Sequence, residues 1–179
     1  MRYHNITTAD MMNGEGLRVV LWLSGCRHHC YNCQNPVTWD ENDGLIFDES
    51  AKEELFIELG KDYISGLTLS GGDPLHEANL NGVLELVNEF RLLFPNKSIW
   101  LYSGYDYQKV MRQLPNLATK ENHNMYKRQQ IIKQCDVMVD GRYIDSQRNP
   151  SKKWAGSDNQ RVISIPESLK HGKVVLYCD

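Results

Sequence analysis

The chain has 179 residues, a formal net charge of −3 and a hydrophobic content of 41%. This length suits one domain with its own core, which we expect to span residues 1–179, and the weakly acidic balance gives no electrostatic basis for nucleic-acid binding. No apolar run approaches the ~20 residues of a membrane helix, and the first residues lack the apolar stretch of a signal peptide, so we expect a cytoplasmic protein with no membrane partner.

Short apolar runs that alternate with longer amphipathic ones indicate an α/β fold with a mostly parallel sheet. Strands are predicted at residues 19–23, 67–69, 99–102 and 137–139, and later strands of undetermined direction at 162–165 and 174–177. The run at 19–23 is apolar on both faces, as buried parallel strands are. The polar segment 118–130 fits either a helix with a loop or a local insertion.

Two helices are predicted between the first three of these strands. Ser50 and Glu53 form a capping-box pattern, which places the start of the first helix near Ser50. The residues that it is expected to bury are Leu55, Phe56 and Leu59. The second helix ends before Pro95, and apolar residues recur along it at helical spacing. The residues that it is expected to bury are Leu80, Val83, Leu84, Val87 and Phe90.

Three cysteines fall within eight residues, at Cys26, Cys30 and Cys33. In a reducing compartment such a group is typical of metal binding and not of disulfides. Three thiolates hold three corners of a cubic [4Fe-4S] cluster and leave the fourth iron without a protein ligand, whereas a cluster that only carries electrons is normally held by four cysteines. The spacing therefore favours a cluster whose open iron binds a small molecule.

A second interpretation of this loop is a structural zinc site in which His28 or His29 joins the three cysteines. The chain would then be a zinc-stabilised binding module without catalysis. Chelation by a histidine inside so short a loop is sterically tight, which disfavours zinc. The other four histidines show no ligand spacing and are expected to be surface or ordinary polar residues. Cys135 adjoins an apolar run and is expected to be a small buried hydrophobe.

A distinctive segment follows each of the first four predicted strands. The cysteine loop follows the first, Ser70–Pro74 the second, Ser103–Tyr105 the third and Asp140–Gly141 the fourth. In parallel α/β folds the carboxyl ends of the strands share one edge, and ligands bind there. If these strands are parallel, the four segments converge on one site.

Gly71 and Gly72 stand directly after a buried strand. Paired glycines let the backbone approach a ligand closely, and their carbonyl oxygens can accept hydrogen bonds from an ammonium group. An ordinary strand-to-helix turn explains the same pair equally well.

The cysteine spacing followed by Gly71-Gly72-Asp73-Pro74 resembles the radical S-adenosylmethionine (SAM) superfamily. Further motifs narrow the resemblance to the activating proteins of anaerobic ribonucleoside-triphosphate reductase, which are glycyl-radical-enzyme activases. These motifs are Asn13–Arg18, Trp22–Cys26, Asn35–Trp39, Val139–Tyr143 and Gly156–Arg161. They extend over most of the chain.

The resemblance implies a single-domain incomplete (β/α) barrel and a [4Fe-4S] cluster bound by Cys26, Cys30 and Cys33. It also implies that SAM binds the open iron and that no catalytic side chain is needed beyond the cluster and SAM. The residues that it implies in SAM binding are Asn32, Cys33 and Gln34 through their backbone, Gly71, Gly72 and Asp73 near the methionyl ammonium, and Ser103 and Asp140 at the neighbouring strand ends. For Asp140, a solvated turn acid is an equally good interpretation.

The resemblance further implies an enzyme that cleaves SAM reductively to a 5′-deoxyadenosyl radical and generates a glycyl radical on a partner, anaerobic ribonucleoside-triphosphate reductase. A low-potential electron donor such as a flavoprotein is the second implied partner. Alternatives are another glycyl-radical enzyme or a small molecule as the substrate. Asn159, Gln160 and Arg161 precede a predicted strand, so they reach the proposed site only if that strand runs antiparallel. A partner contact and a plain loop are both open for them.

Overall fold

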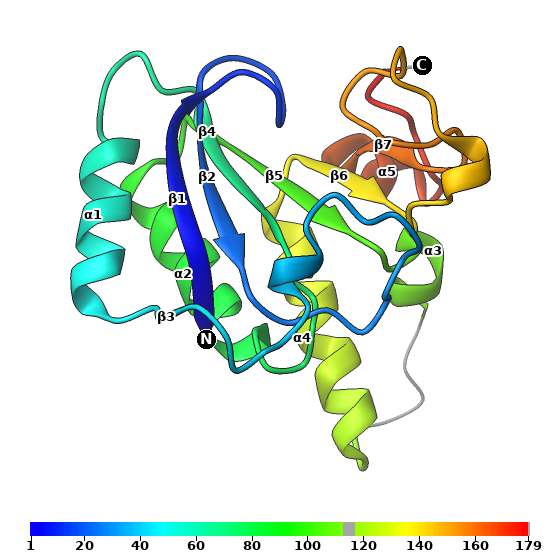
Figure 1. Ribbon diagram of the computed structural model, residues 1–179, viewed down its shortest axis with the longest axis horizontal. Helices are drawn as coiled ribbons and strands as arrows, with labels where there is room; N and C mark the ends of the chain where they lie inside the picture. The colour runs from blue at the N-terminus through cyan, green and yellow to red at the C-terminus, as the bar shows by residue number, and fades with distance from the viewer. Residues whose placement is uncertain (113–116, 179) are drawn as a thin grey trace.

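The computed structural model of the chain describes residues 1–112 and 117–178 (Figure 1). Its strands are β1 (Arg2–Asp10), β2 (Arg18–Leu23), β3 (Leu45–Ile46), β4 (Gly66–Gly71), β5 (Ser98–Ser103), β6 (Val137–Asp140) and β7 (Arg161–Ser164). Its α-helices are α1 (Glu49–Leu59), α2 (Leu80–Leu93), α3 (Tyr107–Val110), α4 (Lys120–Gln134) and α5 (Ile165–His171), and short 3₁₀ helices lie at Pro36–Thr38 and Asp145–Gln147.

All seven strands belong to one sheet, in the order β3-β1-β2-β4-β5-β6-β7. The four strands β2, β4, β5 and β6 are parallel neighbours, as predicted. On either side of them the pairings β1–β2, β1–β3 and β6–β7 are antiparallel. The prediction of a mostly parallel sheet is therefore wrong for half of the strand pairings. Within the described ranges the sheet is open, with β3 and β7 at its edges, and closure toward a barrel is not part of what the structure shows.

The central strands were predictable because both of their faces are buried. Val19, Val20 and Leu21 of β2 are fully buried, as are Leu67 and Leu69 of β4. In contrast, β1 escaped prediction, because its sequence is mostly polar and its residues are mostly part-buried or exposed. It joins the sheet through backbone pairing with β2 and needs few apolar side chains.

The first predicted helix is present, but its N-cap differs from the predicted one. The side chain of Asp48 caps α1 by accepting a hydrogen bond from the Ala51 amide at 3.0 Å, so the predicted capping box at Ser50 is wrong. Asp48 stands two residues earlier and satisfies the same kind of unpaired amide. Leu55 and Leu59 are fully buried, as predicted.

The next helices show the same mixture of agreement and correction. In α2 the fully buried positions include Leu86, while Leu84 is only part-buried, because the buried face is turned slightly from the predicted one. In the polar segment 118–130, residues 120–130 are helical and belong to α4, while 118 and 119 precede it. The side chain of Thr119 caps α4 by accepting from the Asn122 amide. Ile131 and Ile132 anchor this polar helix in the core.

The two late strand predictions have different outcomes. Residues 161–164 form β7, which runs antiparallel to β6. Residues 174–177 do not form a strand, and only a single bridge joins Leu176 to Ile163. The two backbone hydrogen bonds of this bridge, from Ser164 to Val175 and from Tyr177 to Val162, do not continue into a regular ladder.

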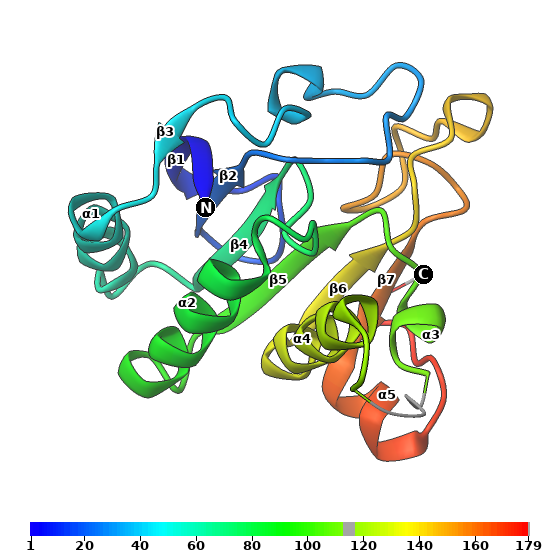
Figure 2. The same cartoon turned by 90° about the horizontal axis from the view of Figure 1, so that it is seen from below.

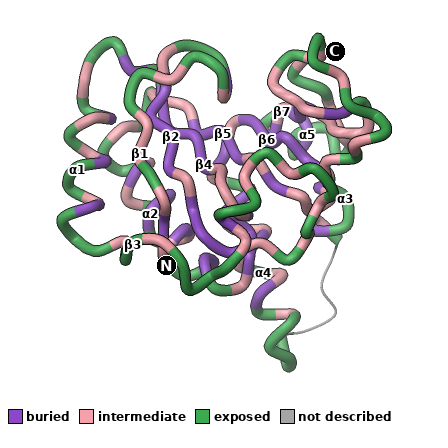
Figure 3. Tube along the Cα trace, in the orientation of Figure 1, coloured by how far each residue is buried: buried purple, intermediate pink, exposed green. Residues whose placement is uncertain are grey.

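The molecule has two layers. Figure 2 shows α1, α2, α4 and α5 on one side of the sheet, and the segment 24–44 on the other side. The main core lies between the helices and the sheet, and Figure 3 shows that burial is concentrated in the central strands. A smaller cluster on the opposite face centres on Trp100, whose ring packs edge-on against those of Trp154 and Tyr177. No helix in residues 1–112 or 117–178 combines the length and the apolar character needed to span a bilayer.

Candidate metal centre

The four segments singled out in the sequence meet at one edge of the sheet. Because β2, β4, β5 and β6 are parallel, their carboxyl ends point the same way. The cysteine loop, Ser70–Pro74, Ser103–Tyr105 and Asp140–Gly141 follow these ends in turn. The convergence that the sequence predicted on the condition of parallel strands is confirmed.

The cysteine loop is closed at its base and wound tightly inside. The Gly25 amide donates to the Thr38 carbonyl at 2.8 Å, and the Cys26 amide donates to that of Trp39 at 2.9 Å. Within the loop, His29 and Asn32 have left-handed backbone conformations, with φ of 45° and 53°. Such conformations are uncommon for residues with side chains and are best tolerated by Asn, Asp and His. The residues of the loop therefore suit a tightly wound backbone between the three cysteines.

The three cysteine thiols are part-buried, and none of the three forms a disulfide. The Cys33 amide donates to the Cys30 carbonyl at 3.1 Å, and the Cys33 Sγ accepts from the Asn35 amide at 3.4 Å. Burial raises the pKa of Cys26 to about 11, and the backbone amides of His28 and His29 oppose this shift. Metal coordination is the usual means of deprotonating such a thiol at neutral pH.

The donor set fits an iron–sulfur cluster in chemistry, because three thiols from one short loop supply the ligands that such clusters take. Across the described residues, however, no three His, Cys, Asp or Glu side chains are already gathered as metal ligands. In a cubic cluster each cysteine binds a different iron, so its three thiols need not meet at one point as the ligands of a single ion do.

Neither histidine of the loop is available for a Cys3His zinc site without rearrangement. The Nε2 atom of His28 lies 2.8 Å from Asp73 Oδ2. The ring of His29 packs against that of Trp39, with centroids 4.7 Å apart. This geometry argues against the zinc interpretation.

Gly71 and Gly72 bring the segment after β4 against the rest of the chain. Gly71 has φ of 100°, and a Cβ there would lie 2.6 Å from the backbone of Leu23. A Cβ on Gly72 would lie 2.5 Å from the carbonyl oxygen of Gly25 and 2.8 Å from that of Thr38. The sequence predicted that the paired glycines approach a ligand; the structure shows a close approach to the end of β2 and the base of the cysteine loop, and the ligand contact stays a prediction.

Asp73 and Ser103 are buried and bonded to each other. The Ser103 hydroxyl donates to the Asp73 carboxylate at 2.9 Å, and the amides of Gly104 and Leu75 donate to it at 2.9 and 2.8 Å. With His28 included, this carboxylate accepts from four residues. The sequence predicted both side chains as SAM contacts, and the structure shows that each is already engaged in joining the strand-end segments.

Asp140 carries a counterion that the sequence did not pair with it. Arg161 Nε donates to Oδ1 at 3.0 Å and Nη2 donates to Oδ2 at 2.5 Å, while the Tyr107 amide also reaches Oδ2. Hydrogen bonding to Asp140 raises the pKa of Arg161 above its ordinary value. Arg161 lies here because β7 runs antiparallel, which is the condition on which its place at this edge depended.

Asn159 and Gln160 hold the segment that follows β6. The Asn159 side-chain amide donates to the Arg142 carbonyl at 2.8 Å, and that of Gln160 donates to the Gly141 carbonyl at 3.0 Å. Gln160 Oε1 also accepts from the Gly156 amide at 2.9 Å. In this structure both side chains act within the loop, which agrees with the plain-loop interpretation.

Neither His28 nor Arg142 was predicted to link separate segments, although both lie within or beside the predicted motifs. The partner of His28 stands 45 residues away. Arg142 Nη2 donates to the His28 carbonyl at 2.5 Å across 114 residues. Of the remaining predicted residues, Asn32 and Gln34 flank Cys33 and are exposed.

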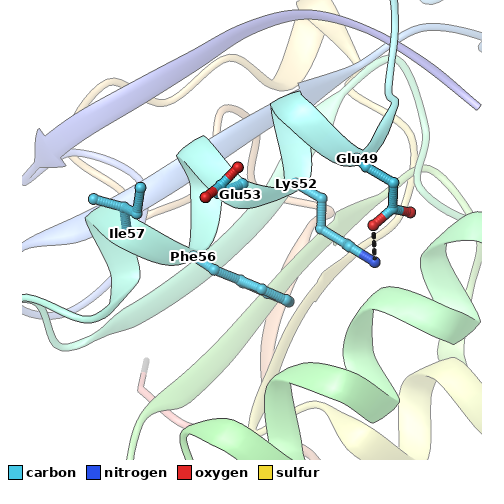
Figure 4. A pocket seen from close by; sticks show the side chains of 5 residues that line it. All are labelled: Glu49, Lys52, Glu53, Phe56 and Ile57. Atoms are coloured by element: carbon cyan, nitrogen blue, oxygen red, sulfur yellow. Dashed lines mark ion pairs between the residues drawn. The ribbon is translucent and has the colours of Figure 1, made fainter.

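Two hollows among the described residues bear on where a ligand could bind. One of about 400 Å³ lies between the cysteine loop and the segment after β6, and its lining residues are Cys30, Tyr31, Arg142, Tyr143, Ile144, Asp145 and Ser146. The other, of about 490 Å³, lies along α1 (Figure 4) and is lined by Glu49, Lys52, Glu53, Phe56 and Ile57. Only the first adjoins a predicted cluster ligand, so the larger hollow is not part of the metal centre.

Comparison with known proteins supports an iron–sulfur cluster in this chain. Residues 12–163 match the family model described as a 4Fe-4S single cluster domain. The chain is 39% identical to the anaerobic ribonucleoside-triphosphate reductase-activating protein of Enterobacteria phage T4, over 96% of this chain and 99% of that protein. It is 37% and 35% identical to the proteins of the same name from Vibrio cholerae serotype O1 and Escherichia coli K12, each over 90% of this chain and 97% of the relative. The chain therefore belongs to the 4Fe-4S single cluster family that includes the anaerobic ribonucleoside-triphosphate reductase-activating proteins.

Proposed function

We propose that this protein is a radical SAM activase that generates a glycyl radical on anaerobic ribonucleoside-triphosphate reductase. The observation that carries the proposal is a loop with three cysteines and no fourth, held against Gly71 and Gly72 at the carboxyl edge of the parallel strands. The names of the relatives support the choice of partner.

A bound and reduced cluster would supply the one electron needed for homolytic cleavage of the S–C5′ bond of SAM, with methionine and a 5′-deoxyadenosyl radical as products. That radical would take a hydrogen atom from a glycine of the partner. In this proposal Cys26, Cys30 and Cys33 hold the cluster. The protein otherwise contributes binding and orientation.

The remaining predicted residues surround SAM in the proposal. The carbonyl groups of Gly71 and Gly72 accept from its ammonium, and the backbone of Asn32 to Gln34 contacts its adenine. Asp73, Ser103 and Asp140 act indirectly in the proposal. Their side chains hold together the strand-end segments that carry the SAM contacts. No side chain needs to move a proton in this reaction.

The hollow between the cysteine loop and residues 142–146 supports a polypeptide as the substrate. It adjoins Cys30, and it presents an exposed aromatic ring at Tyr31 together with the polar side chains of Arg142 and Asp145. An extended loop of a partner offers both apolar and hydrogen-bonding groups to such a lining.

Three further features belong to the proposal. Residues 1–179 act as one domain whose open sheet is an incomplete barrel of the radical SAM type. A low-potential donor such as a flavoprotein supplies the electron, and the cytoplasm supplies the reducing compartment that such a cluster requires.

The test is anaerobic reconstitution with iron and sulfide, followed by reduction in the presence of SAM. We expect about four irons per chain, the count set by the cluster type, and release of 5′-deoxyadenosine. A glycyl-radical signal by electron paramagnetic resonance (EPR) is expected when anaerobic ribonucleoside-triphosphate reductase is added. Deoxyadenosine without that signal would move the substrate to another glycyl-radical enzyme or a small molecule. One zinc and no iron would favour the binding module instead.

A further inference from the structure

His28 lies where four segments of the candidate site meet. Its Nε2 atom is 2.8 Å from Asp73 Oδ2, in the segment after β4. Because an ionised carboxylate only accepts hydrogen bonds, this nitrogen carries the proton and donates it. His28 thereby connects the middle of the cysteine loop to a buried carboxylate that also binds Ser103 and Gly104 at the end of β5.

The carboxylate that receives this bond is fixed and buried. Asp73 is 1% exposed, and the amides of Leu75 and Gly104 and the hydroxyl of Ser103 hold it from its own segment and from β5. A hydrogen bond to a charged, desolvated acceptor is among the stronger ones in proteins. His28 is therefore anchored to a group that does not move with the loop.

The space around the imidazole is also shaped for it. A Cβ on Gly104 would lie 2.4 Å from the His28 ring, so a side chain at this position would displace the ring. The ring of Tyr105 packs edge-on against the imidazole, with centroids 4.9 Å apart. The His28 side chain is only 16% exposed although it belongs to a surface loop.

A second contact fixes the backbone of the same residue. Arg142 Nη2, from the segment after β6, donates to the His28 carbonyl at 2.5 Å. His28 stands two residues after Cys26 and two before Cys30, so its position constrains both thiols. The neighbouring ion pair of Arg27 with Glu77 is a weaker anchor, because Arg27 is largely exposed.

We propose that His28 is a positioning residue, which docks the cysteine loop on Asp73 and so sets where the Cys26 and Cys30 sulfur atoms lie relative to Gly71 and Gly72. The inference rests on the proposed cluster site but not on the identity of the partner. It assigns His28 no contact with the cluster or with SAM.

The test compares four full-length proteins: the parent, His28→Ala, His28→Gln and Arg27→Ala. Gln keeps an N–H donor at a reach similar to that of the imidazole, while Arg27→Ala removes the exposed ion pair next door and serves as the matched control. Amide hydrogen exchange of residues 26–33 is measured on each protein before and after cluster reconstitution, together with the EPR spectrum of the reduced cluster with and without SAM.

We expect His28→Ala to exchange its loop amides about tenfold faster than the parent, the factor that corresponds to ~1.4 kcal/mol. We also expect an altered EPR spectrum when SAM is added, with both effects largely reversed in His28→Gln and absent in Arg27→Ala. If His28→Ala fails to fold, His28→Asn, whose amide is too short to reach Asp73, replaces it in the comparison.

The inference would be overturned if His28→Ala had the loop exchange and the EPR spectrum of the parent. If the parent also cleaved SAM, the proposed function would still stand. A different outcome is that His28→Ala loses protection of its loop amides while the parent protein releases no deoxyadenosine from SAM. That result would refute the proposed function and support the docking role of His28.

Discussion

Each cysteine of the loop supplies a thiol that nothing nearby replaces, because His28 is bonded to Asp73 and the His29 ring packs on Trp39. Cys30→Ala leaves two thiolates, which cannot hold a cubic cluster well. We expect a loss of cluster affinity that exceeds the ~10–100-fold cost of removing a group beyond the ligands. Iron and sulfide content after anaerobic reconstitution measures it, with Cys178→Ala as control. A parental absorption spectrum in Cys30→Ala would contradict the ligand assignment.

Gly72 is the residue where the loop after β4 comes nearest to the cysteine loop. In Gly72→Val the new Cβ would lie 2.5 Å from the Gly25 carbonyl oxygen, so one of the two segments must move. We expect the unfolding free energy to fall by ~1–3 kcal/mol, as for other overpacked sites. Iron content and denaturant midpoints measure the effect. Gly60→Ala is the matched control, because a Cβ there meets nothing nearer than 3.3 Å.

If Gly72→Val kept its midpoint and iron content and lost only SAM affinity, Gly72 would act through the ligand alone. That outcome would mean that the chain relaxes around the new side chain at little cost, and it would contradict the close packing as the reason for this glycine.

His76 is buried, so of the two alternatives predicted for it the surface residue is wrong and the ordinary polar residue stands. Burial lowers its pKa below the ordinary value, and the nearby carboxylate of Glu41 opposes this shift. In the unfolded chain His76 binds a proton near pH ~6.5, whereas in the folded chain it does so only at lower pH. The unfolding free energy therefore falls as the pH drops below ~6.5. Denaturant unfolding at pH ~7.5 and ~5.5 tests this.

The matched comparison for His76 is His76→Gln against His171→Gln, since His171 is exposed near the end of α5. We expect the acid-dependent loss to shrink in His76→Gln and to stay parental in His171→Gln. Equal pH profiles in all three proteins would show that other groups account for the acid dependence.

At the scale of elements, the pair Asp140–Arg161 joins β6 to β7. Asp140 is 1% exposed, and its carboxylate forms an ion pair with the guanidinium of Arg161. Arg161→Met leaves a buried carboxylate bonded mainly to the Tyr107 amide. Removal of one partner from a buried pair costs ~3–5 kcal/mol, and because Arg161 is partly exposed we expect ~2–3 kcal/mol. Thermal or denaturant unfolding measures it.

The exposed Arg148→Met serves as the control for Arg161→Met, and the double variant Asp140→Asn with Arg161→Met removes the uncompensated charge. We expect that double variant to regain part of the lost stability. If Arg161→Met were as stable as the control, solvent would already be screening Asp140, and the pair would not hold β7.

The elements that the sequence predicted correctly are those buried on both faces. The strands at 19–23, 67–69, 99–102 and 137–139 carry apolar runs because helices and loops cover them. The missed strand β1 lies between β2 and the two-residue β3, and the false strand at 174–177 lies beside the edge strand β7. In both places backbone pairing and not side-chain pattern decides. The direction of β7 had no local signal, since only its pairing with β6 fixes it.

The candidate site divides in the same way. The three cysteines and the paired glycines are readable because their spacing is local. The roles of Asp73, Asp140 and Arg161 cannot be read from the sequence, because their partners lie in other strand-end segments. Without visible partners, the two carboxylates were predicted to bind SAM. The contact of His28 with Asp73 was hidden for the same reason.

For the whole molecule, the metal centre is separate from the main core. The buried apolar core lies between the helices and one face of the sheet, and it includes none of the three cysteines. The cysteine loop lies outside it and is held mainly by hydrogen bonds at its base and through His28. Loss of a metal unfolds small proteins whose core is the metal site, but this chain has a core of its own.

We therefore expect removal of the cluster by a chelator to leave the helix and sheet content unchanged by far-ultraviolet circular dichroism. Faster amide exchange should be confined to the segment from Ser24 to Trp39 and to the strand-end segments that contact it. The cluster adds stability only through the loop that it orders, so the thermal midpoint should fall by a few degrees, as ~1 kcal/mol does for a domain of this size. Global unfolding of the cluster-free chain would mean that the loop, and not the sheet, supports the fold. The strand-end contacts described here would then depend on the metal instead of preparing its site.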